Sequence, residues 1–250
     1  MAREWDATTY DSLPLPHERW GQRTLGRLRL TGTETVLDAG AGTGRDTAAL
    51  LAAVPDGRVI AVDGSEKMLA ALLARLADRP DLRDRLTVLR ADLTAPLPLP
   101  EQVDAVFSVA TFHWIPDHDA LFRNLAAVLR PGGQFVFDCG GHGNIAAVER
   151  AIGELVPDRA PVWPFASAEE TAARLRSAGF VDVLTSLDPD PTRLDDPGTL
   201  RLFLETIILG ADLDRLSAEE HAGFVDAVAK RLPEPVIDYV RLTGTARRGA

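Results

Sequence analysis

Short, continuously apolar runs alternate with longer stretches of helical leucine and alanine spacing through the first 140 residues. A continuous apolar run bounded by turn residues is typical of a parallel strand that is covered on both faces. Strands separated by helices in this way indicate βαβ crossovers, so we expect an α/β fold with a doubly wound, mostly parallel sheet. The predicted strands of this part cover about residues 35–37, 58–63, 86–89, 103–110 and 134–139.

The pattern changes after residue 139. A glycine-rich loop at 140–144 comes next, and Ser167 and Ser217 each open a stretch with the spacing of a helix capping box. Because the chain has no internal repeat and no convincing linker, residues 1–250 are expected to form one domain. The elements predicted here are helices at about 145–155, 168–177, 197–209 and 218–232, and strands at about 180–187 and 236–245.

Charge and cysteine content narrow the class of protein. Twenty-seven basic and 37 acidic side chains give the 250-residue chain a net charge of −10, a field that repels nucleic acid and anionic lipid. No apolar run approaches the roughly 18 residues of a membrane span, and the first residues lack the apolar core of a signal peptide. A single cysteine, Cys139, excludes an intramolecular disulfide. We therefore expect a cytoplasmic protein that binds neither nucleic acid nor membranes.

The segment from Val36 to Gly44 reads Val-Leu-Asp-Ala-Gly-Ala-Gly-Thr-Gly and joins a predicted strand to a helix. Glycines at such a turn let a ligand approach the backbone closely, while N–H groups at the helix start face anionic groups. A dinucleotide-binding loop requires Gly-x-Gly-x-x-Gly. Here Gly44 comes one residue early, and Arg45 occupies the usual place of the third glycine. The spacing disfavours NAD, although an NAD-dependent oxidoreductase stays an alternative.

Further motifs follow in order along the chain. Asp63 and Asp92 end the second and third predicted strands, Phe107–Trp114 closes the fourth, and Leu129–Gly133 reads Leu-Arg-Pro-Gly-Gly. With the glycine loop, these motifs resemble those of the class I S-adenosylmethionine-dependent methyltransferases over about residues 34–139. The resemblance implies a Rossmann-like methyltransferase sheet with an antiparallel last strand and helical cap insertions. It also implies S-adenosyl-L-methionine as the cofactor.

The resemblance assigns individual residues to this cofactor. Asp38 and Gly40 would border the methionine part, and Gly42 would keep the turn open for the sulfonium and ribose. Asp63 would accept hydrogen bonds from both ribose hydroxyls, and Asp92 would accept one from the adenine amino group. The competing interpretation of these two carboxylates is a role in turns or helix caps. The other expected contacts are Gly64, Met68, Ala91, Leu93 and Ala110, and core packing is the competing interpretation of Met68.

Three segments narrow the resemblance. Residues 5–11, 112–118 and 140–144 resemble those of the trans-aconitate 2-methyltransferases and their bacterial relatives, although Ala41 stands where cysteine is common in that group. This resemblance favours a small-molecule acceptor, with a carboxylate as the candidate acceptor group. It implies N-terminal lid helices over 1–32, a cofactor-binding core over 33–139, and acceptor-cap segments at 140–166 and 194–232.

Methyl transfer from a sulfonium requires alignment and exclusion of water more than covalent catalysis. His113 is the candidate general base because it follows the end of the fourth strand, and hydrogen bonding to backbone is its competing interpretation. His118 and His142 are expected in solvent or loops, and no third ligand at useful spacing supports a metal site.

Candidate acceptor contacts come from both ends of the chain. Tyr10 and Trp20 lie with Gln22 on a predicted short amphipathic helix, where core packing is the alternative for the tryptophan. Arg241 can bind a carboxylate bidentately, and a surface ion pair is its alternative. The other two candidates are Phe112 and Trp114.

Two other functions stay open at this point. One is a methyltransferase that acts on nucleic acid or protein. An enzyme that methylates nucleic acid would need an Asn/Asp-Pro-Pro-Tyr type ending of the fourth strand and a basic surface. The chain instead reads Ala-Thr-Phe-His at 110–113. The other is a non-catalytic module that binds S-adenosylmethionine. We expect a monomer or a homodimer.

Overall fold

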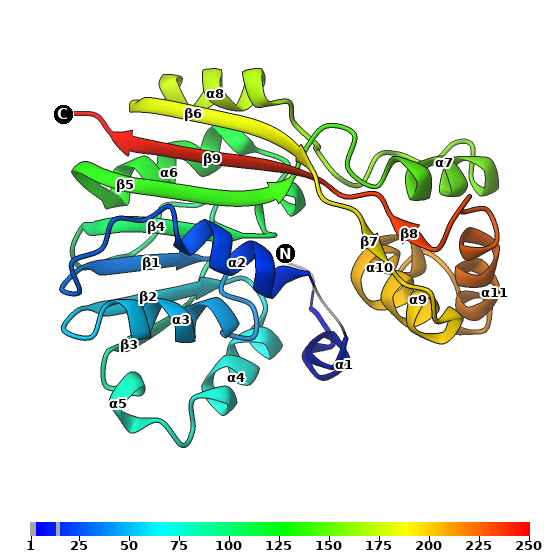
Figure 1. Ribbon diagram of the computed structural model, residues 1–250, viewed down its shortest axis with the longest axis horizontal. Coiled ribbons are helices and arrows are strands. Elements are labelled where there is room, and N and C mark those ends of the chain that lie inside the picture. Colours follow the sequence, from blue (N-terminus) through cyan, green and yellow to red (C-terminus); the bar gives the residue numbers. More distant parts are fainter. Residues whose placement is uncertain (1–3, 14–15) are drawn as a thin grey trace.

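A seven-stranded sheet forms the centre of the molecule in the computed structural model, which describes residues 4–13 and 16–250 (Figure 1). The strand order is β3-β2-β1-β4-β5-β9-β6; β9 runs antiparallel to its neighbours β5 and β6, and the other pairings are parallel. The predicted fold class is therefore confirmed. The strands are β1 (Thr35–Ala39), β2 (Arg58–Asp63), β3 (Leu86–Arg90), β4 (Val103–Val109), β5 (Leu129–Gly140), β6 (Phe180–Pro189) and β9 (Val240–Arg248).

Helices cover both faces of the sheet. Val36 and Leu37 are consecutive and fully buried, yet they belong to different hydrophobic clusters, because successive strand residues point to opposite faces. The cluster of Val36 contains Leu50 of α3, and the cluster of Leu37 contains Leu121 of α6. On the first face lie α2 (His17–Leu25), α3 (Arg45–Ala53) and α4 (Glu66–Arg75), and on the second α6 (His118–Val128) and α8 (Ala168–Ser177).

A group of helices lies beyond the carboxyl ends of the parallel strands, on the right in Figure 1. This helical cap consists of α7 (Ala146–Leu155), α9 (Pro197–Phe203), the π-helix η2 (Leu204–Ile208), α10 (Gly210–Leu213) and α11 (Ala218–Ala229). The guanidinium of Arg159 pairs with Glu149 on α7 and with Asp212 on α10, so one buried side chain connects two of its helices. The strands β7 (Thr192–Arg193) and β8 (Val236–Ile237) pair where the chain enters and leaves the cap.

The structure differs from the predicted elements in several places. The last strand, expected at 236–245, is interrupted at Asp238–Tyr239, and β9 extends to Arg248. The expected helix at 197–209 changes into the π-helix η2 after Phe203. The remaining short elements, which sequence periodicity does not reveal, are α5 (Pro80–Arg83) and the 3-10 turn η1 (Phe112–Trp114).

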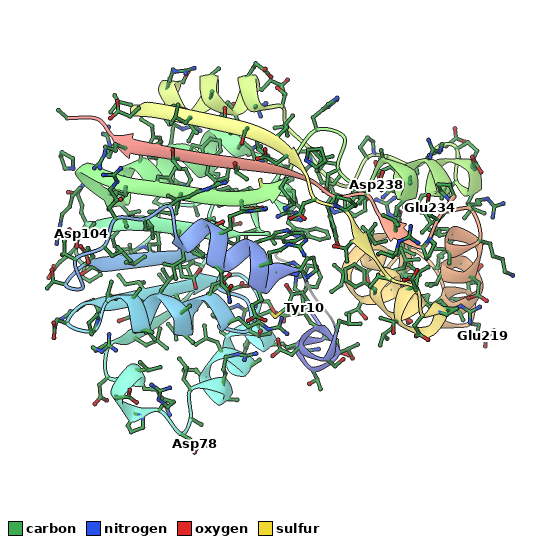
Figure 2. The ribbon with its side chains drawn as sticks, viewed as in Figure 1. Tyr10, Asp78, Asp104, Glu219, Glu234 and Asp238 are labelled. Carbon is green, nitrogen blue, oxygen red and sulfur yellow. The ribbon has the colours of Figure 1, made fainter. Side chains whose placement is uncertain are left out.

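The N-terminal segment forms two helices instead of one amphipathic helix. Tyr10 lies on α1 (Ala7–Ser12), whereas Trp20 and the exposed Gln22 lie on α2. Figure 2 shows Tyr10 on the side of the sheet that faces the cap. Residues 1–3 and 14–15 of the expected lid lie outside the described residues. None of the helices in the described part of the chain combines the length and apolar character needed to span a membrane.

Candidate active site

A cavity of about 580 Å³ opens at the carboxyl ends of β1, β2 and β4. Its wall combines Gly40 after β1, Asp63 at the end of β2 and Ala110 after β4 with Trp20 of α2 and Ile207 of η2. In open α/β sheets, ligands bind in the crevice outside the carboxyl ends of the strands, where the strand order reverses. The cavity therefore lies where the topology predicts a site, with the helical cap as its far wall.

The glycine loop shapes one end of the cavity. Gly40, Gly42 and Gly44 all have positive φ values, of 86°, 53° and 82°. A Cβ on Gly40 would lie 2.1 Å from Thr111 Oγ1, and one on Gly44 would lie 2.6 Å from Leu72, so these two glycines pack against protein. A Cβ on Gly42 would meet no atom within 4 Å, because it would point into the cavity that Gly42 lines. Gly42 therefore leaves room for a ligand against the backbone.

Two carboxylates line the same end of the cavity. The backbone N–H groups of Gly42 and Ser65 donate to Asp63 at 2.9 and 2.8 Å, so Asp63 stabilises the loop and also faces the cavity. Burial raises the pKa of Asp63. Asp92 accepts from the N–H and hydroxyl of Thr94, which hold its pKa below the usual value. Both carboxylates line the cavity while they make these turn contacts, so turn duty does not exclude the ligand contacts expected of them.

Most of the other expected cofactor contacts also line the cavity. They include Ala110, whose φ of 56° is rare for a residue with a Cβ and turns the chain away from the sheet directly after β4. Its N–H donates to the Asp138 carbonyl at 2.7 Å, which holds this turn in place. Met68 is buried, as core packing requires, and it also lines the cavity, so its contact with the cofactor stays a prediction. The others in the wall are Gly64, Ala91 and Leu93.

Two of the expected site residues lie outside the cavity wall. Asp38 is 1% exposed, and the hydroxyl of Thr47 donates to its Oδ2 at 2.6 Å. Burial raises the pKa of Asp38 to about 8. The hydrogen bond from Thr47 connects β1 to α3, and the expected place of Asp38 beside the methionine part of the cofactor is not supported by its position. Phe112 is also 1% exposed, and its ring packs against Phe122 and Phe137 in the core. The expectation that Phe112 contacts an acceptor is therefore not supported by its position.

His113 lines the cavity, but its hydrogen bonding argues against the expected general base. The backbone N–H of Gly140 donates to His113 Nδ1 at 3.2 Å. Burial, with the nearby charge of Arg241, lowers the pKa of His113 well below its usual value. A neutral imidazole that accepts at Nδ1 carries its proton on Nε2. The ring is thus bonded to backbone through Nδ1, which fits the competing expectation, and Nε2 is left as its donor.

The other two histidines considered from the sequence lie apart from the cavity wall. His118 is 4% exposed and its Nε2 lies 3.0 Å from the Phe112 carbonyl oxygen, so the expectation of a solvent position is wrong for this residue. His142 is exposed in the loop after β5. No group of three or more His, Cys, Asp or Glu side chains within residues 4–13 and 16–250 is arranged to hold a metal ion.

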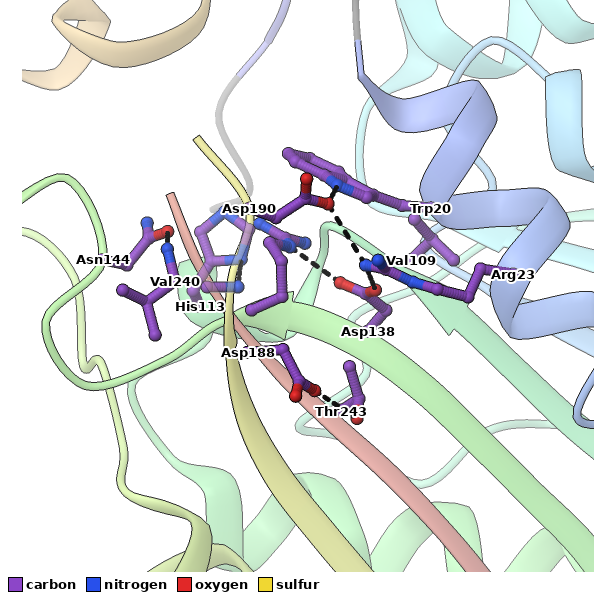
Figure 3. Close-up of polar contacts among 12 residues, drawn as sticks. Trp20, Arg23, Val109, His113, Asp138, Asn144, Asp188, Asp190, Val240 and Thr243 are labelled. Atoms are coloured by element: carbon purple, nitrogen blue, oxygen red, sulfur yellow. Dashed lines mark hydrogen bonds and ion pairs between the residues drawn. The ribbon is translucent and has the colours of Figure 1, made fainter. Parts of the chain in front are cut away.

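Arg241 is buried, which overturns the alternative of a surface ion pair. It is 1% exposed, its Nε donates to Asp138 Oδ1 at 2.7 Å, and its guanidinium carbon lies 3.6 Å from the centre of the Trp20 ring. Arg23 donates to the other oxygen of Asp138 at 3.1 Å, and Trp20 Nε1 donates to Asp190 at 2.7 Å. Figure 3 shows Trp20 and Arg23 of α2 reaching toward Asp138 and Asp190.

Aromatic rings form the wall nearest the cap. Trp114 lies 5.1 Å from Trp5 and 5.8 Å from Trp163 between ring centres, and Trp163 stacks on Phe165 at 5.6 Å. Tyr10 lies 6.1 Å from Trp5 and continues this wall. Of the acceptor-binding candidates, Tyr10, Trp20, Trp114 and Arg241 therefore lie in the wall of the cavity.

Several wall residues were not among the candidate site residues. His17 and Tyr239 lie beside Trp20, while Asn144 accepts the N–H of Val240 at 2.9 Å (Figure 3). Trp163 and Ile207 come from segments that had no match to a motif. The loop at 140–144 did contribute to the narrower resemblance, but its composition alone did not single out Asn144 as a residue of the site.

Comparison with known proteins gives consistent matches. Residues 36–133 match a family model described as a methyltransferase domain. The chain is 33% identical over 208 residues to a malonyl-[acyl-carrier protein] O-methyltransferase of Methylococcus capsulatus, covering 82% of this chain and 73% of that protein. It is 28% identical over 242 residues to a trans-aconitate 2-methyltransferase of Methylobacterium radiotolerans, covering 92% and 89%.

The fold has solved counterparts. A phosphoethanolamine N-methyltransferase of Haemonchus contortus, solved with phosphomonomethylethanolamine and S-adenosylhomocysteine, superposes with a TM-score of 0.63 at 21% identity. The match covers 93% of this chain and 53% of that one. At this identity the likeness concerns the fold.

Proposed function

This chain belongs to the S-adenosylmethionine-dependent methyltransferases, and we propose that it methylates a small-molecule acceptor, a carboxylate-bearing one being favoured. The observation that carries the proposal is the form of the cavity. Its glycine and carboxylate end leads directly into an aromatic end that contains a buried guanidinium. The names of two relatives, a trans-aconitate and a malonyl-carrier methyltransferase, refer to acceptors that carry carboxylates.

The glycine end fits the adenosyl part of the cofactor. The space beside Gly42, which a Cβ would fill without touching protein, lets a ligand lie against the loop. Asp63 and Asp92 follow adjacent strands and would accept hydrogen bonds from the ribose hydroxyls and the adenine amino group. Met68 and Leu93 supply apolar contacts for the base. S-adenosylmethionine, when bound, supplies an electrophilic methyl group.

The rest of the cavity would align the acceptor and exclude water. In-line displacement depends on positioning, and a closed aromatic wall strengthens polar contacts made inside it. Trp114, Trp163 and Phe165 would hold the body of the acceptor, and the Nε2–H of His113 would donate to an oxygen of it. A carboxylate acceptor is already a nucleophile at neutral pH, so this role for His113 requires no general base.

A macromolecular substrate is the weaker candidate. The net charge of −10 opposes approach to a nucleic acid, and α1, α2 and the cap surround the cavity, which favours a compact acceptor. We infer on the same grounds that the enzyme works on a diffusible metabolite. A single, buried cysteine suits a reducing compartment, so we place this activity in the cytoplasm. A non-catalytic module that binds the cofactor is the alternative that the following assay excludes.

The proposal is tested with the purified full-length protein. S-adenosylhomocysteine formation is measured with a panel of carboxylic acids and their amides, and cofactor binding is measured by calorimetry. We expect turnover with one or more acids, and an Asp63→Asn variant should bind S-adenosylhomocysteine about 10- to 100-fold more weakly. Glu66→Gln, an exposed acid at the start of α4, is the matched control and should bind normally. Cofactor binding without turnover of any acceptor would favour the non-catalytic module.

A further inference from the structure

Within residues 4–13 and 16–250, three buried polar atoms at the β9 end of the cavity find no hydrogen-bond partner: Arg241 Nη2, Tyr239 Oη and His17 Nδ1. All three residues line the cavity. An unsatisfied buried donor costs free energy, commonly about 1–3 kcal/mol, so three of them in one place need an explanation. The explanation we develop is that they are satisfied by a bound ligand.

Trp20 brings these three side chains together. Its ring centre lies 4.9 Å from that of His17, 5.0 Å from that of Tyr239, and 3.6 Å from the guanidinium carbon of Arg241. The indole is fixed in turn, because its Nε1 donates to Asp190 Oδ2 at 2.7 Å. The three polar atoms thus belong to side chains held on a common, rigid ring.

One nitrogen of the Arg241 guanidinium, Nε, has a fixed partner. Its Nε donates to Asp138 Oδ1, and Arg23 neutralises the second oxygen of that carboxylate. Nη2 is the part of the fork with no partner. A guanidinium stacked on an indole and tethered at Nε loses little further freedom when it binds an anion, so the residual donor is well prepared for one.

We propose that Arg241 Nη2, Tyr239 Oη and His17 Nδ1 bind a carboxylate group of a small molecule in the cavity. Two carboxylate oxygens provide enough lone pairs for the three donors. Burial and, to a smaller extent, the charge of Arg241 lower the pKa of His17 to about 3, so this ring is neutral. The site uses the tautomer that carries the proton on Nδ1, because only that tautomer donates from Nδ1 to a carboxylate. Burial raises the pKa of Tyr239, which keeps its hydroxyl a donor.

The charges in the wall restrict the ligand further. Among the described residues that line the cavity, Arg241 is the one with a permanent positive charge, and Asp63 and Asp92 are negative. A ligand with several carboxylates would leave most of them uncompensated in a buried site. The site therefore favours one carboxylate attached to an apolar or aromatic body that packs on Trp114 and Trp163.

The identity of the bound molecule rests on the proposed function. In the proposed reaction, two molecules carry a carboxylate. One is the acceptor and the other is the amino-acid part of the cofactor. In the sheet order, β9 is separated from β1 by β4 and β5, whereas Asp63 and Asp92 lie on the opposite side of β1. Neighbouring strands are about 4.8 Å apart, so the site lies well away from the nucleoside end of the cavity.

The test compares Tyr239→Phe and Arg241→Lys with the wild-type protein by calorimetry. Tyr239→Phe removes one unpartnered oxygen and should leave thermal stability unchanged, which guards against unfolding of the arginine variant. Thr24→Val is the matched control, since Thr24 Oγ1 is also buried and unpartnered but lies on α2 away from the cavity wall. The ligands are S-adenosylhomocysteine, 5′-methylthioadenosine (which lacks the amino-acid part), acetate, phenylacetate and phenylacetamide.

The two sources give different results. If the site binds the cofactor carboxylate, both variants weaken S-adenosylhomocysteine at least about 10-fold and leave 5′-methylthioadenosine unchanged. If it binds the acceptor, both nucleosides bind normally, and the preference of the cofactor-bound wild type for phenylacetate or acetate over phenylacetamide is lost in the variants.

The inference is overturned if the variants bind both nucleosides normally and one of two further results is found. Either the wild type does not prefer a carboxylate over its amide, or it does and the variants keep that preference. Failure of the proposed function appears differently, as a wild-type protein that binds no S-adenosylhomocysteine. The preference for phenylacetate over phenylacetamide is then measured on the protein without cofactor, so the two failures are distinguishable.

Discussion

Arg241 Nε donates to Asp138 Oδ1 at 2.7 Å, and both side chains are almost completely buried. The two residues are 103 positions apart, on the antiparallel neighbours β9 and β5, where Asp138 pairs with Thr243 and Arg241 with Gly140. The side chain of Arg241 therefore reaches back along β5 and over the sheet to Trp20. This single ion pair fixes the orientation of the guanidinium at the cavity wall.

Removing the partner of this arginine should be costly. Asp138→Ala leaves a buried guanidinium without its counter-ion, which commonly destabilises a protein by about 3–5 kcal/mol. Urea denaturation of wild type and variant measures the free energy of unfolding. Asp81→Ala breaks the exposed pair with Arg79 and should produce no measurable change. Equal losses in the two variants would show that burial of the Asp138 pair has no special importance.

Gly42→Ala should separate folding from binding. Its φ of 53° makes alanine cost about 1–2 kcal/mol, but its Cβ would meet no protein atom. We expect a folded variant whose affinity for S-adenosylhomocysteine falls at least about 10-fold, because the methyl group occupies the ligand space. Gly132→Ala has a similar φ of 78° and equally open surroundings, and Gly132 does not line the cavity. This control should lose similar stability and no affinity, and unaltered binding by Gly42→Ala would contradict the placement of the cofactor.

The role of His113 can be read from two substitutions. His113→Gln can keep an N–H directed into the cavity, whereas His113→Ala removes it. If His113 is a hydrogen-bond donor, turnover with an acceptor found in the screen should fall about 10- to 100-fold in the alanine variant and much less in the glutamine variant. Since burial lowers the pKa of His113, wild type and His113→Gln should have parallel pH profiles near pH 6.5. A general base predicts instead that both variants are equally inactive.

Asp38 should make stability depend on pH. Burial raises its pKa to about 8 in the folded chain, so folding favours the protonated form, and this contribution is lost as pH rises from about 4 to 8. Asp38→Asn stays neutral and can still accept the hydroxyl of Thr47. The free energy of unfolding of the variant minus that of the wild type should therefore increase with pH across this range, by at most about 1.4 kcal/mol per pH unit. Urea denaturation at pH 5, 6.5 and 8 measures the gain, and a constant difference would contradict the assignment.

The elements whose signal is local were predicted well. The apolar run at 58–63 corresponds to β2 over the same residues, and the capping boxes at Ser167 and Ser217 open α8 and α11. The glycine spacing at 40–44 matched a turn with three positive φ values, which few other residues tolerate. Such features depend on neighbouring residues and on one face of an element, so a single sequence reveals them.

Directions of side chains in irregular segments were predicted less well. Phe112, His113 and Trp114 were taken together as residues of the site, but they form a 3-10 turn, in which three residues complete a turn. Phe112 consequently enters the core, and His113 and Trp114 face the cavity. The residue types alone could not separate them, because all three rings suit both environments.

By itself, the sequence determined the sheet, its glycine loop and the acidic residues that follow β2 and β3, since each depends on residues close together in the chain. Only the tertiary structure decided that His17, Tyr239 and Arg241 converge on Trp20, and that Asp138 holds the arginine beneath them. That convergence depends on the position of β9 beside β5 and of α2 across β4 and β5. The pairing of distant segments is a property of the whole packed core, and no local spacing of residues specifies it.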